Sequence, residues 1–234
     1  MKILDTLHGR YVTGRRARRL SRLIAEVLPR GASVLDVGCG DGKIARLVMD
    51  ARPDVALEGI DVMLRPRSVI PVGLYDGRVI PHSDRSFDVV MFVDVLHHTD
   101  NPVGLLLEAA RVARTAVVVK DHAAEGLFAY PTLRFMDRLG NCRHNVAMPY
   151  NYLTLGQWWE AFDRLGLVAA HWTHRLNLYP FPADLIFGRR LHFLSRLEPD
   201  PARPTVNGGR ARSRPLRSSA IAHQSPAVGR PSSQ

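Results

Sequence analysis

Residues 34–42 carry the sequence Val34-Leu35-Asp36-Val37-Gly38-Cys39-Gly40-Asp41-Gly42, and this stretch decides the fold. The apolar residues before the glycines predict a buried strand over residues 33–37, and a helical pattern follows over residues 41–49. Glycine is needed where the backbone takes a positive φ or approaches a ligand closely. A strand, a glycine turn and a helix in this order are typical of an open α/β sheet, with a binding site at the carboxyl end of the strand.

Apolar periodicity extends this unit along the chain. Further strands are expected over residues 55–60, 68–72, 86–93, 115–119, 167–173 and 191–197. Further helices are expected over residues 14–28, 102–112, 127–139 and 154–165. Strands that alternate with helices predict parallel βαβ units, and continuously apolar strands predict a sheet covered on both faces. The expected fold class is α/β: a Rossmann-like three-layer αβα sandwich around a mostly parallel seven-stranded sheet with an antiparallel edge strand.

Composition divides the 234-residue chain into three parts. Residues 1–30 are expected to form a basic amphipathic helix that packs on the domain, because apolar residues recur on one face and arginines fill the other. Residues 31–198 form the predicted domain. Residues 199–234 are rich in Arg, Pro and Ser with few large apolar residues, and we expect a disordered tail.

The formal net charge of +10 is concentrated at the two ends of the chain. Six arginines lie between residues 10 and 22 and six between 203 and 230, whereas the body between them is nearly neutral. Nucleic-acid binding is usually signalled by a basic face on the domain itself, so this placement favours an exposed arginine surface and argues against a nucleic-acid partner. The two cysteines are too few for a disulfide framework, and no apolar run is long enough for a membrane span. A cytoplasmic protein is expected.

The glycine loop differs from a dinucleotide loop. Its spacing is G-x-G-x-G, and acids stand beside it at Asp36 and Asp41. Such acids would repel a pyrophosphate but suit a cationic ligand. Asp61 ends the second predicted strand at the spacing expected for a carboxylate that accepts hydrogen bonds from ribose hydroxyls.

Four segments resemble the class I S-adenosylmethionine-dependent methyltransferase family, in its small-molecule branch. They are residues 34–42, residues 58–62, residues 76–88 and Asp94-Val95-Leu96-His97-His98-Thr99-Asp100-Asn101-Pro102. The resemblance covers about residues 20–175. It implies S-adenosylmethionine as the cofactor and a methyl group transferred to a small-molecule or lipid-like acceptor.

The resemblance also implies roles for individual residues. The backbone of Gly38, Cys39 and Gly40 would cradle the methionine portion and the ribose, and Asp36 would support the loop and the amino group. Further cofactor contacts are implied for Asp61 at the ribose, Val62, Asp76 and Gly77 around the adenine, and Val93 and Asp94 near the methionine end.

The sequence indicates less about the methyl acceptor than about the cofactor. A general base is needed only if the acceptor carries a hydroxyl or a protonated amine. His97 and His98 are the candidates, because they follow the fourth strand and histidine titrates near neutral pH. Polar and aromatic residues that we place in a loop after the fifth strand could contact the acceptor: His122, His144, Tyr150 and Tyr152. No metal is expected, because His122, His144, His171 and His174 form no standard ligand motif.

Three other functions remain open at this point. The arginine-rich ends could guide methylation of RNA or of a protein. The chain could instead be a binding module that keeps the cofactor fold without catalysis. An NAD-dependent oxidoreductase is the third, although the loop spacing argues against it.

Overall fold

The computed structural model describes residues 2–141, 150–188 and 190–203. Seven strands form one sheet in the order β3-β2-β1-β4-β5-β7-β6. They are β1 (Ser33–Val37), β2 (Ala56–Asp61), β3 (Val72–Leu74), β4 (Phe87–Val93), β5 (Ala113–His122), β6 (Leu167–Thr173) and β7 (His192–Pro199). Strand β7 is antiparallel to both β5 and β6, and the other pairs are parallel. The predicted fold class is confirmed, with the antiparallel strand one position inside the edge strand β6.

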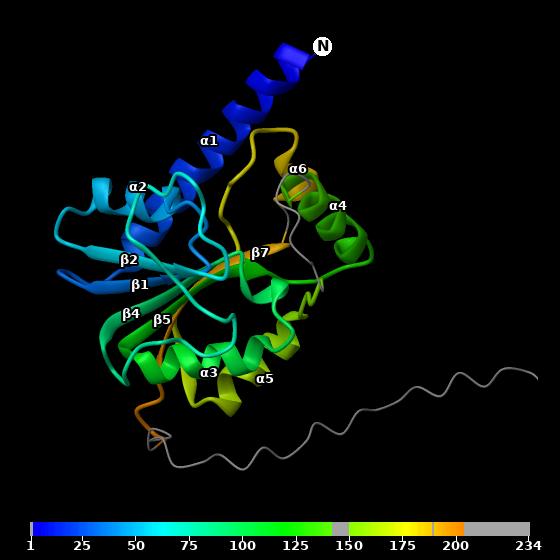
Figure 1. Ribbon diagram of the computed structural model, residues 1–234. Coiled ribbons are helices and arrows are strands. Elements are labelled where there is room, and N and C mark those ends of the chain that lie inside the picture. Colours follow the sequence, from blue (N-terminus) through cyan, green and yellow to red (C-terminus); the bar gives the residue numbers. More distant parts are fainter. Residues whose placement is uncertain (1, 142–149, 189, 204–234) are drawn as a thin grey trace, which may run out of the picture.

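Helices cover the sheet on both faces (Figure 1). The helical segments are α1 (Lys2–Val27), α2 (Lys43–Ala51), the 3-10 turn η1 (Leu96–His98), α3 (Pro102–Val112), α4 (Ala129–Asn141), α5 (Leu155–Arg164) and α6 (Asp184–Phe187). Helices α1 and α2 lie on one face, and α3 and α5 on the other. Helices α4 and α6 lie together beyond the sheet, on the side where β5 ends.

Two apolar layers form the core. On one face, Leu20 and Ile24 of α1 pack with Val34 and Met91 of the central strands. On the other face, Trp158 of α5 belongs to a cluster that includes side chains of β1, β4, β5 and β7. Alternate residues of each strand enter opposite layers, as the pleat of a strand requires.

Helix starts follow local sequence signals. The Asn101 side chain accepts a hydrogen bond from the Gly104 N–H at 2.9 Å, and Pro102 occupies the first position of α3. Thr154 and Gln157 form a capping box at the start of α5, which confirms Thr154 as the predicted cap. Pro131 lies in the first turn of α4. Backbone N–H groups in this turn have no partner within the helix, so the N–H that proline lacks costs no hydrogen bond.

Some predicted boundaries were wrong. The third strand begins at Val72, whereas we had placed it over residues 68–72. The fifth strand continues to His122, so Asp121 and His122 are buried strand residues and do not belong to a loop. Charged residues in that stretch ended the predicted strand early, because the pattern shows polarity but not which polar groups are paired inside the protein. Helix α1 begins well before residue 14, and α6 was not predicted.

The division into helix, domain and tail remains a prediction. Residues just after the predicted boundary contact the body: the Asp200 N–H donates to the Gly166 carbonyl at 2.8 Å, and Arg203 pairs with Asp163 at 2.8 Å. The rest of the predicted tail, residues 204–234, lies outside the described residues. Among those described, no helix combines the length and the apolarity that a membrane crossing demands.

Helix α1 should be an integral part of the folded unit. Ile24 is 0% exposed between α1 and the sheet, so Ile24→Ala should lower the free energy of unfolding by about 2–5 kcal/mol through lost burial and a cavity. Urea denaturation measures the change. Glu26→Ala, on the exposed side of the same helix, is the control and should change the stability by about 0.5 kcal/mol or less. Equal stability of the two variants would contradict the packing of α1.

Candidate active site

The glycine loop after β1 is held in a left-handed backbone conformation. Gly38 has a φ of 75°, and its N–H donates to the Ile60 carbonyl at 2.7 Å. A Cβ atom at Gly38 would lie 2.6 Å from a methyl carbon of Val95, so any larger residue would clash with the segment after β4. Glycine is therefore required here for the conformation and for the close approach.

Asp61 ties this loop to the end of β2. One carboxylate oxygen accepts from the Gly40 N–H at 2.8 Å, and the other accepts from the Met63 N–H at 2.9 Å. The side chain is buried but lines a cavity in front of the loop. Each oxygen has a second lone pair, so the carboxylate can accept further hydrogen bonds from a ligand.

The cavity has a volume of about 740 Å³ and extends from the ends of β1 and β2 to the segment after β4. Its lining includes most of the predicted cofactor residues, namely Gly38, Gly40, Asp61, Val62, Asp76, Gly77 and Asp94. Sequence reasoning missed other lining residues: Met63, Arg65, Tyr75, Arg78, Val95, Thr99, Asp100, Asn101, Gly104 and Leu105. Most of these lie in the loops that follow β2, β3 and β4. In these loops, roles were predicted only for residues that match a motif of the family.

Three predicted cofactor residues lie outside the cavity lining. Asp36 is buried behind the loop, and its Oδ1 has no partner among the described residues. Burial and the neighbouring Asp61 raise the pKa of Asp36 to about 7. The Cys39 side chain packs toward Gly59 of β2, and Val93 ends β4. The predicted contacts of these three residues with the cofactor remain predictions.

Asp76 is held by its own turn. Its Oδ1 accepts from the Arg78 and Val79 N–H groups, both at 2.8 Å. These backbone donors lower the pKa of Asp76, so the exposed carboxylate is charged at neutral pH. Gly77, with a φ of 79°, passes beside Val62 and completes this wall.

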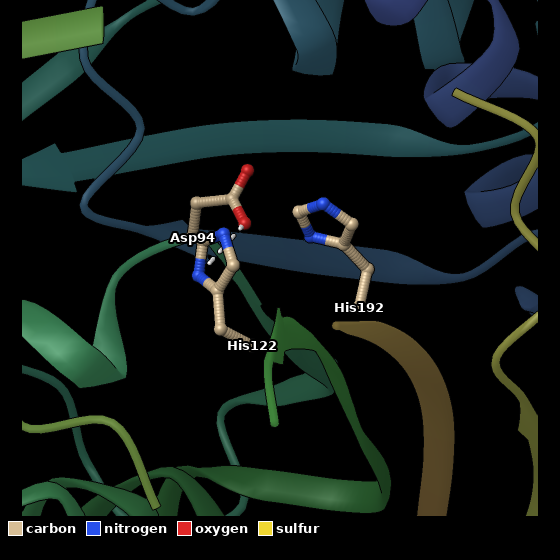
Figure 2. A group of neighbouring side chains, drawn as sticks. All are labelled: Asp94, His122 and His192. Atoms are coloured by element: carbon tan, nitrogen blue, oxygen red, sulfur yellow. Dashed lines mark ion pairs between the residues drawn. The ribbon is translucent and has the colours of Figure 1, made fainter. Parts of the chain in front are cut away.

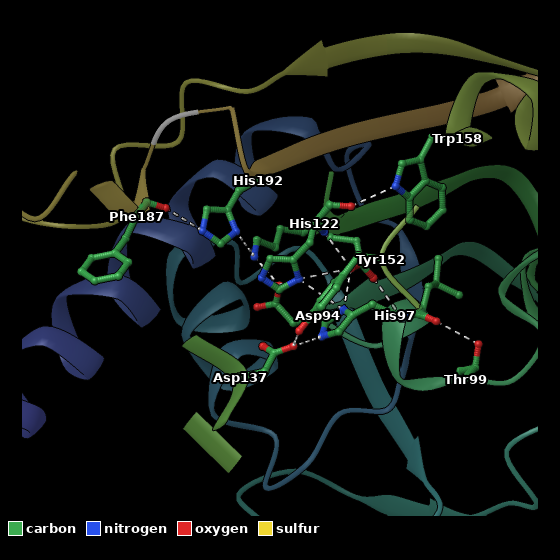
Figure 3. A network of polar contacts seen from close by, with 12 residues as sticks. Asp94, His97, Thr99, His122, Asp137, Tyr152, Trp158, Phe187 and His192 are labelled. Carbon is green, nitrogen blue, oxygen red and sulfur yellow. Dashed lines mark hydrogen bonds and ion pairs between the residues drawn. The ribbon is translucent and has the colours of Figure 1, made fainter. Parts of the chain in front are cut away.

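At the other end of the cavity, Asp94 joins a buried network of charged side chains (Figure 3). Asp94 accepts hydrogen bonds from Lys120 of β5 and, at 2.5 Å, from Arg16 of α1. Burial alone would raise the pKa of Asp94, but the two cations hold it well below its usual range. The arginine-rich face of α1 is therefore not entirely solvated, since Arg16 compensates a charge at the cavity wall.

Asp94, His122 and His192 converge as a carboxylate and two imidazoles, an arrangement that suits a metal ion (Figure 2). The Lys120 ammonium, however, already bonds to Asp94 and lies 3.3 Å from His192 Nδ1. His192 Nε2 lies 3.1 Å from the Phe187 carbonyl. Nε2 must therefore donate, which leaves Nδ1 to accept from Lys120. A metal ion would have to displace this ammonium, so we assign no metal here.

A second chain of contacts runs through His97. Asp121 accepts from the Leu96 and His122 N–H groups and lies 2.6 Å from His97 Nδ1. On its other side, His97 Nε2 lies 3.3 Å from Asp137 of α4. Burial opposes a charge on this ring, but the two carboxylates raise the pKa of His97 to about 10. His97 is thus a buried cation, 1% exposed, and is not part of the cavity lining.

His98 differs from its neighbour in both position and charge. It lines the cavity, and its Nδ1 has no partner among the residues that the structure describes. Its ring centroid lies 3.9 Å from that of His97. Burial and the adjacent His97 cation lower the pKa of His98 to about 4, so this imidazole is neutral at neutral pH. Of the two predicted catalytic histidines, only His98 faces the cavity.

The predicted acceptor residues lie behind this wall. His122 and Tyr152 are buried, and the Tyr152 hydroxyl donates to Asp137. The Tyr150 ring is covered by Arg134, whose guanidinium carbon lies 4.9 Å from the ring centroid. His144 lies outside the described residues.

The predicted site residues did not include Arg16, Lys120, Asp121, Asp137 or His192. A lysine at the end of an otherwise apolar run is the one local signal that could have indicated the network, because an unpaired buried charge is not tolerated.

Comparison with known proteins identifies the family of the chain. A profile of the methyltransferase domain family matches residues 9–182, well over half of the chain. The chain belongs to this class I methyltransferase family. The resemblance inferred from the sequence and its cofactor, S-adenosylmethionine, are thereby confirmed.

Relatives share only part of this methyltransferase. The demethylmenaquinone methyltransferase of Tropheryma whipplei is 32% identical over 149 residues, which cover 56% of this chain and 61% of that protein. The ubiquinone biosynthesis O-methyltransferase of Hahella chejuensis is 33% identical over 96 residues, 36% of this chain and 40% of that protein. The chain thus matches less than two thirds of the length of these relatives.

The fold is shared more widely. A chain from the solved Haloferax volcanii complex of the methyltransferase activator Trm112 has a TM-score of 0.59 with this methyltransferase, at 18% sequence identity. The superposition covers 82% of this chain and 94% of that chain. At this identity the likeness concerns the fold alone.

The buried histidines should make the fold sensitive to acid. Burial and nearby cations lower the pKa of His122 and of His192 in the folded state, whereas an unfolded chain binds protons on histidine near pH 6.5. The unfolded state therefore takes up more protons as the pH falls below about 6.5, and each such histidine lowers the free energy of unfolding by about 1.4 kcal/mol per pH unit. His97 acts oppositely, because its pKa is raised in the folded state. The stability that its charge contributes is fully present below about pH 6.5 and is lost as the pH rises through about 10.

Urea denaturation at pH 7 and at pH 5.5 tests this sign. His192→Gln should lose less stability on acidification than the parent chain, and the exposed His171→Gln should match the parent. Equal losses of stability on acidification in His192→Gln and in the parent chain would contradict the neutral state of His192.

Proposed function

We propose that the chain transfers a methyl group from S-adenosylmethionine to a small-molecule or lipid-like acceptor that bears an ionisable hydroxyl. The observation that carries this proposal is one cavity with two chemically different ends. The glycine loop and Asp61 line one end, and Asp94 and His98 line the other.

The first end fits the cofactor. A Cβ atom added to Gly40 would meet nothing within 4 Å, so the loop leaves open space directly beside Asp61. The Asp61 carboxylate, fixed by two backbone donors, would accept hydrogen bonds from the ribose hydroxyls. Val62, Asp76 and Gly77 would surround the adenine. Asp36, buried and without a partner for Oδ1 among the described residues, would favour the positive amino group of the methionine portion from behind the loop.

The second end would receive the acceptor. The sulfonium of the cofactor supplies an already activated methyl group, so the protein contributes chiefly by positioning the acceptor and by excluding water. Asp94 is rigidly held by Lys120 and Arg16, and it would orient the acceptor through a hydrogen bond. His98 lines the cavity and is neutral at neutral pH, and its imidazole would take the proton from the acceptor hydroxyl.

His97 would act through His98. Its fixed positive charge keeps the adjacent ring neutral, and its bonds to Asp121 and Asp137 fix the turn that carries both residues. One relative is named a demethylmenaquinone methyltransferase, and another is named an O-methyltransferase of ubiquinone biosynthesis. These names support an acceptor that combines an apolar body with a hydroxyl.

Cofactor binding depends on Asp61 in this proposal. Asp61→Ala should weaken binding of S-adenosylhomocysteine by about 10- to 100-fold, because hydrogen bonds to a charged group contribute about 1.5–3 kcal/mol. Isothermal titration calorimetry measures the change. Asp50→Ala removes an exposed acid of α2 that pairs with Arg46, away from the cavity, and should bind normally. Unchanged binding by a folded Asp61→Ala variant would refute the assignment.

Proton removal depends on His98. His98→Ala should lower kcat by about 100-fold with hydroxyl-bearing acceptors, the usual contribution of a general base, while the affinity for S-adenosylhomocysteine stays unchanged. Release of S-adenosylhomocysteine with a panel of catechols and hydroquinones gives the rate, and added imidazole should restore part of it. His171→Ala serves as the control. Equal turnover by His98→Ala and the parent chain would exclude His98 as the base.

A further inference from the structure

The outer surface of α4 is unusually apolar for an exposed helix. Large apolar side chains of α4, of the residues before it and of the α6 segment lie on this surface, with exposed fractions from 51% for Ile186 to 90% for Leu127. We call the following five residues the cap patch: Leu127, Phe128, Phe135, Phe181 and Ile186. Contiguous exposed apolar surface of this kind usually marks an interaction site.

Helix α4 carries apolar side chains on its exposed face as well as on its buried one. Ala129 and Leu133, four residues apart, are buried on the inner face. Phe135 of the same helix is 53% exposed, and Phe128, which directly precedes the helix, is 64% exposed. Large apolar side chains that gather on an exposed surface are normally covered by another structure. The described part of the chain leaves this outer face in solvent.

The α6 segment extends the same surface. The rings of Phe135 and Phe187 are stacked with centroids 6.5 Å apart, which places α6 directly beside α4. Figure 1 shows the two helices together at one corner of the molecule. Phe181 and Ile186 are exposed there and enlarge the patch across both segments.

The exposed charges of helix α4 have one sign. Arg134 and Arg138 are exposed on α4, and Arg175 is exposed before the α6 segment. Residues 126–138 contain a single acid, the buried Asp137, which bonds to Tyr152. Residues 174–188 also contain a single acid, Asp184, which accepts from the Tyr179 N–H at 3.3 Å. An apolar patch that adjoins the exposed arginines of α4 is complementary to an anionic, partly apolar surface.

We propose that the cap patch docks this chain on the interface of a bilayer that contains anionic lipid. The apolar side chains would enter the boundary between headgroups and acyl chains, and the arginines would contact lipid phosphates. A second copy of the chain fits less well, because a two-fold interface places the same patch on both subunits and would bring the arginines of each against those of the other.

Docking at this surface would serve the acceptor end of the cavity. Asp137 on the inner face of α4 contacts His97, whose ring adjoins that of His98 at the cavity. Helix α4 is thus joined to the acceptor end through His97, and an amphiphilic acceptor could pass from the bilayer to the cavity beside this helix. This step rests on the proposed function, whereas bilayer binding itself does not.

Co-sedimentation of the full chain with vesicles tests the proposal. Vesicles of phosphatidylcholine with phosphatidylglycerol should bind the parent chain, and binding should weaken with phosphatidylcholine alone or at high salt. The double variant Leu127→Ser with Phe181→Ser should bind the mixed vesicles about tenfold or more weakly, because each large apolar side chain adds roughly an order of magnitude in affinity. The matched control, Leu74→Ser with Val79→Ser, removes exposed apolar residues at the β3 edge of the sheet and should bind like the parent.

Calorimetric binding of S-adenosylhomocysteine verifies that each variant is folded and tests the cofactor site separately from the lipid surface. Vesicle binding that persists in the Leu127/Phe181 variant would overturn the proposal and would assign binding to the arginine-rich ends. Failure of the parent chain to bind the mixed vesicles at low salt would also overturn it. Light scattering without lipid measures the particle mass of the parent chain and of the patch variant. A mass that is halved in the variant would also overturn the proposal, because the patch would then join two copies of the chain.

Discussion

A completely buried carboxylate at the end of β5 must be compensated, and the active-site wall is built around that requirement. Asp121 accepts two backbone N–H groups and pairs with His97, which replaces the water that burial removed. One of those donors is the N–H of Leu96 in the turn after β4. The carboxylate therefore locks the ends of two central strands together, and the position of His98 follows from that lock.

The same constraint accounts for the distant partners of Asp94. This carboxylate lies at the cavity wall, where it would lose much of its hydration, and two cations from different parts of the chain compensate it. Removing either cation would leave this largely desolvated carboxylate with a single cationic partner, which should cost more than the loss of a surface ion pair. Helix α1 is for this reason connected to the reaction cavity as well as to the hydrophobic core.

Helix α4 joins the polar interior to the surface. Its inner face supplies Asp137 to His97 and Tyr152, whereas its outer face carries Phe128 and Phe135 in solvent. The glycine loop is held in a different way. The loop is fixed by backbone hydrogen bonds and by Asp61, which suits a cofactor common to the whole family. The wall that we propose for the acceptor is instead assembled from side chains of α1, α4, β5 and β7. Under that proposal, variation among those elements would change the acceptor without disturbing the cofactor end.

The sequence by itself determined the α/β fold, the glycine loop after the first strand and the place of Asp61 at the end of the second, because strand periodicity, glycine placement and the spacing from loop to acid are local features that need no knowledge of packing. It also brought His98 to attention, but it could not separate that residue from His97. Only the tertiary structure decided which histidine faces the cavity, that Arg16 leaves the solvated face of its helix, and that Lys120 and His192 meet. These contacts join residues far apart in the chain, and they depend on the insertion of β7 between β5 and β6. Periodicity identifies which side chains are buried, whereas the sheet order and the need to pair buried charges decide which of them meet.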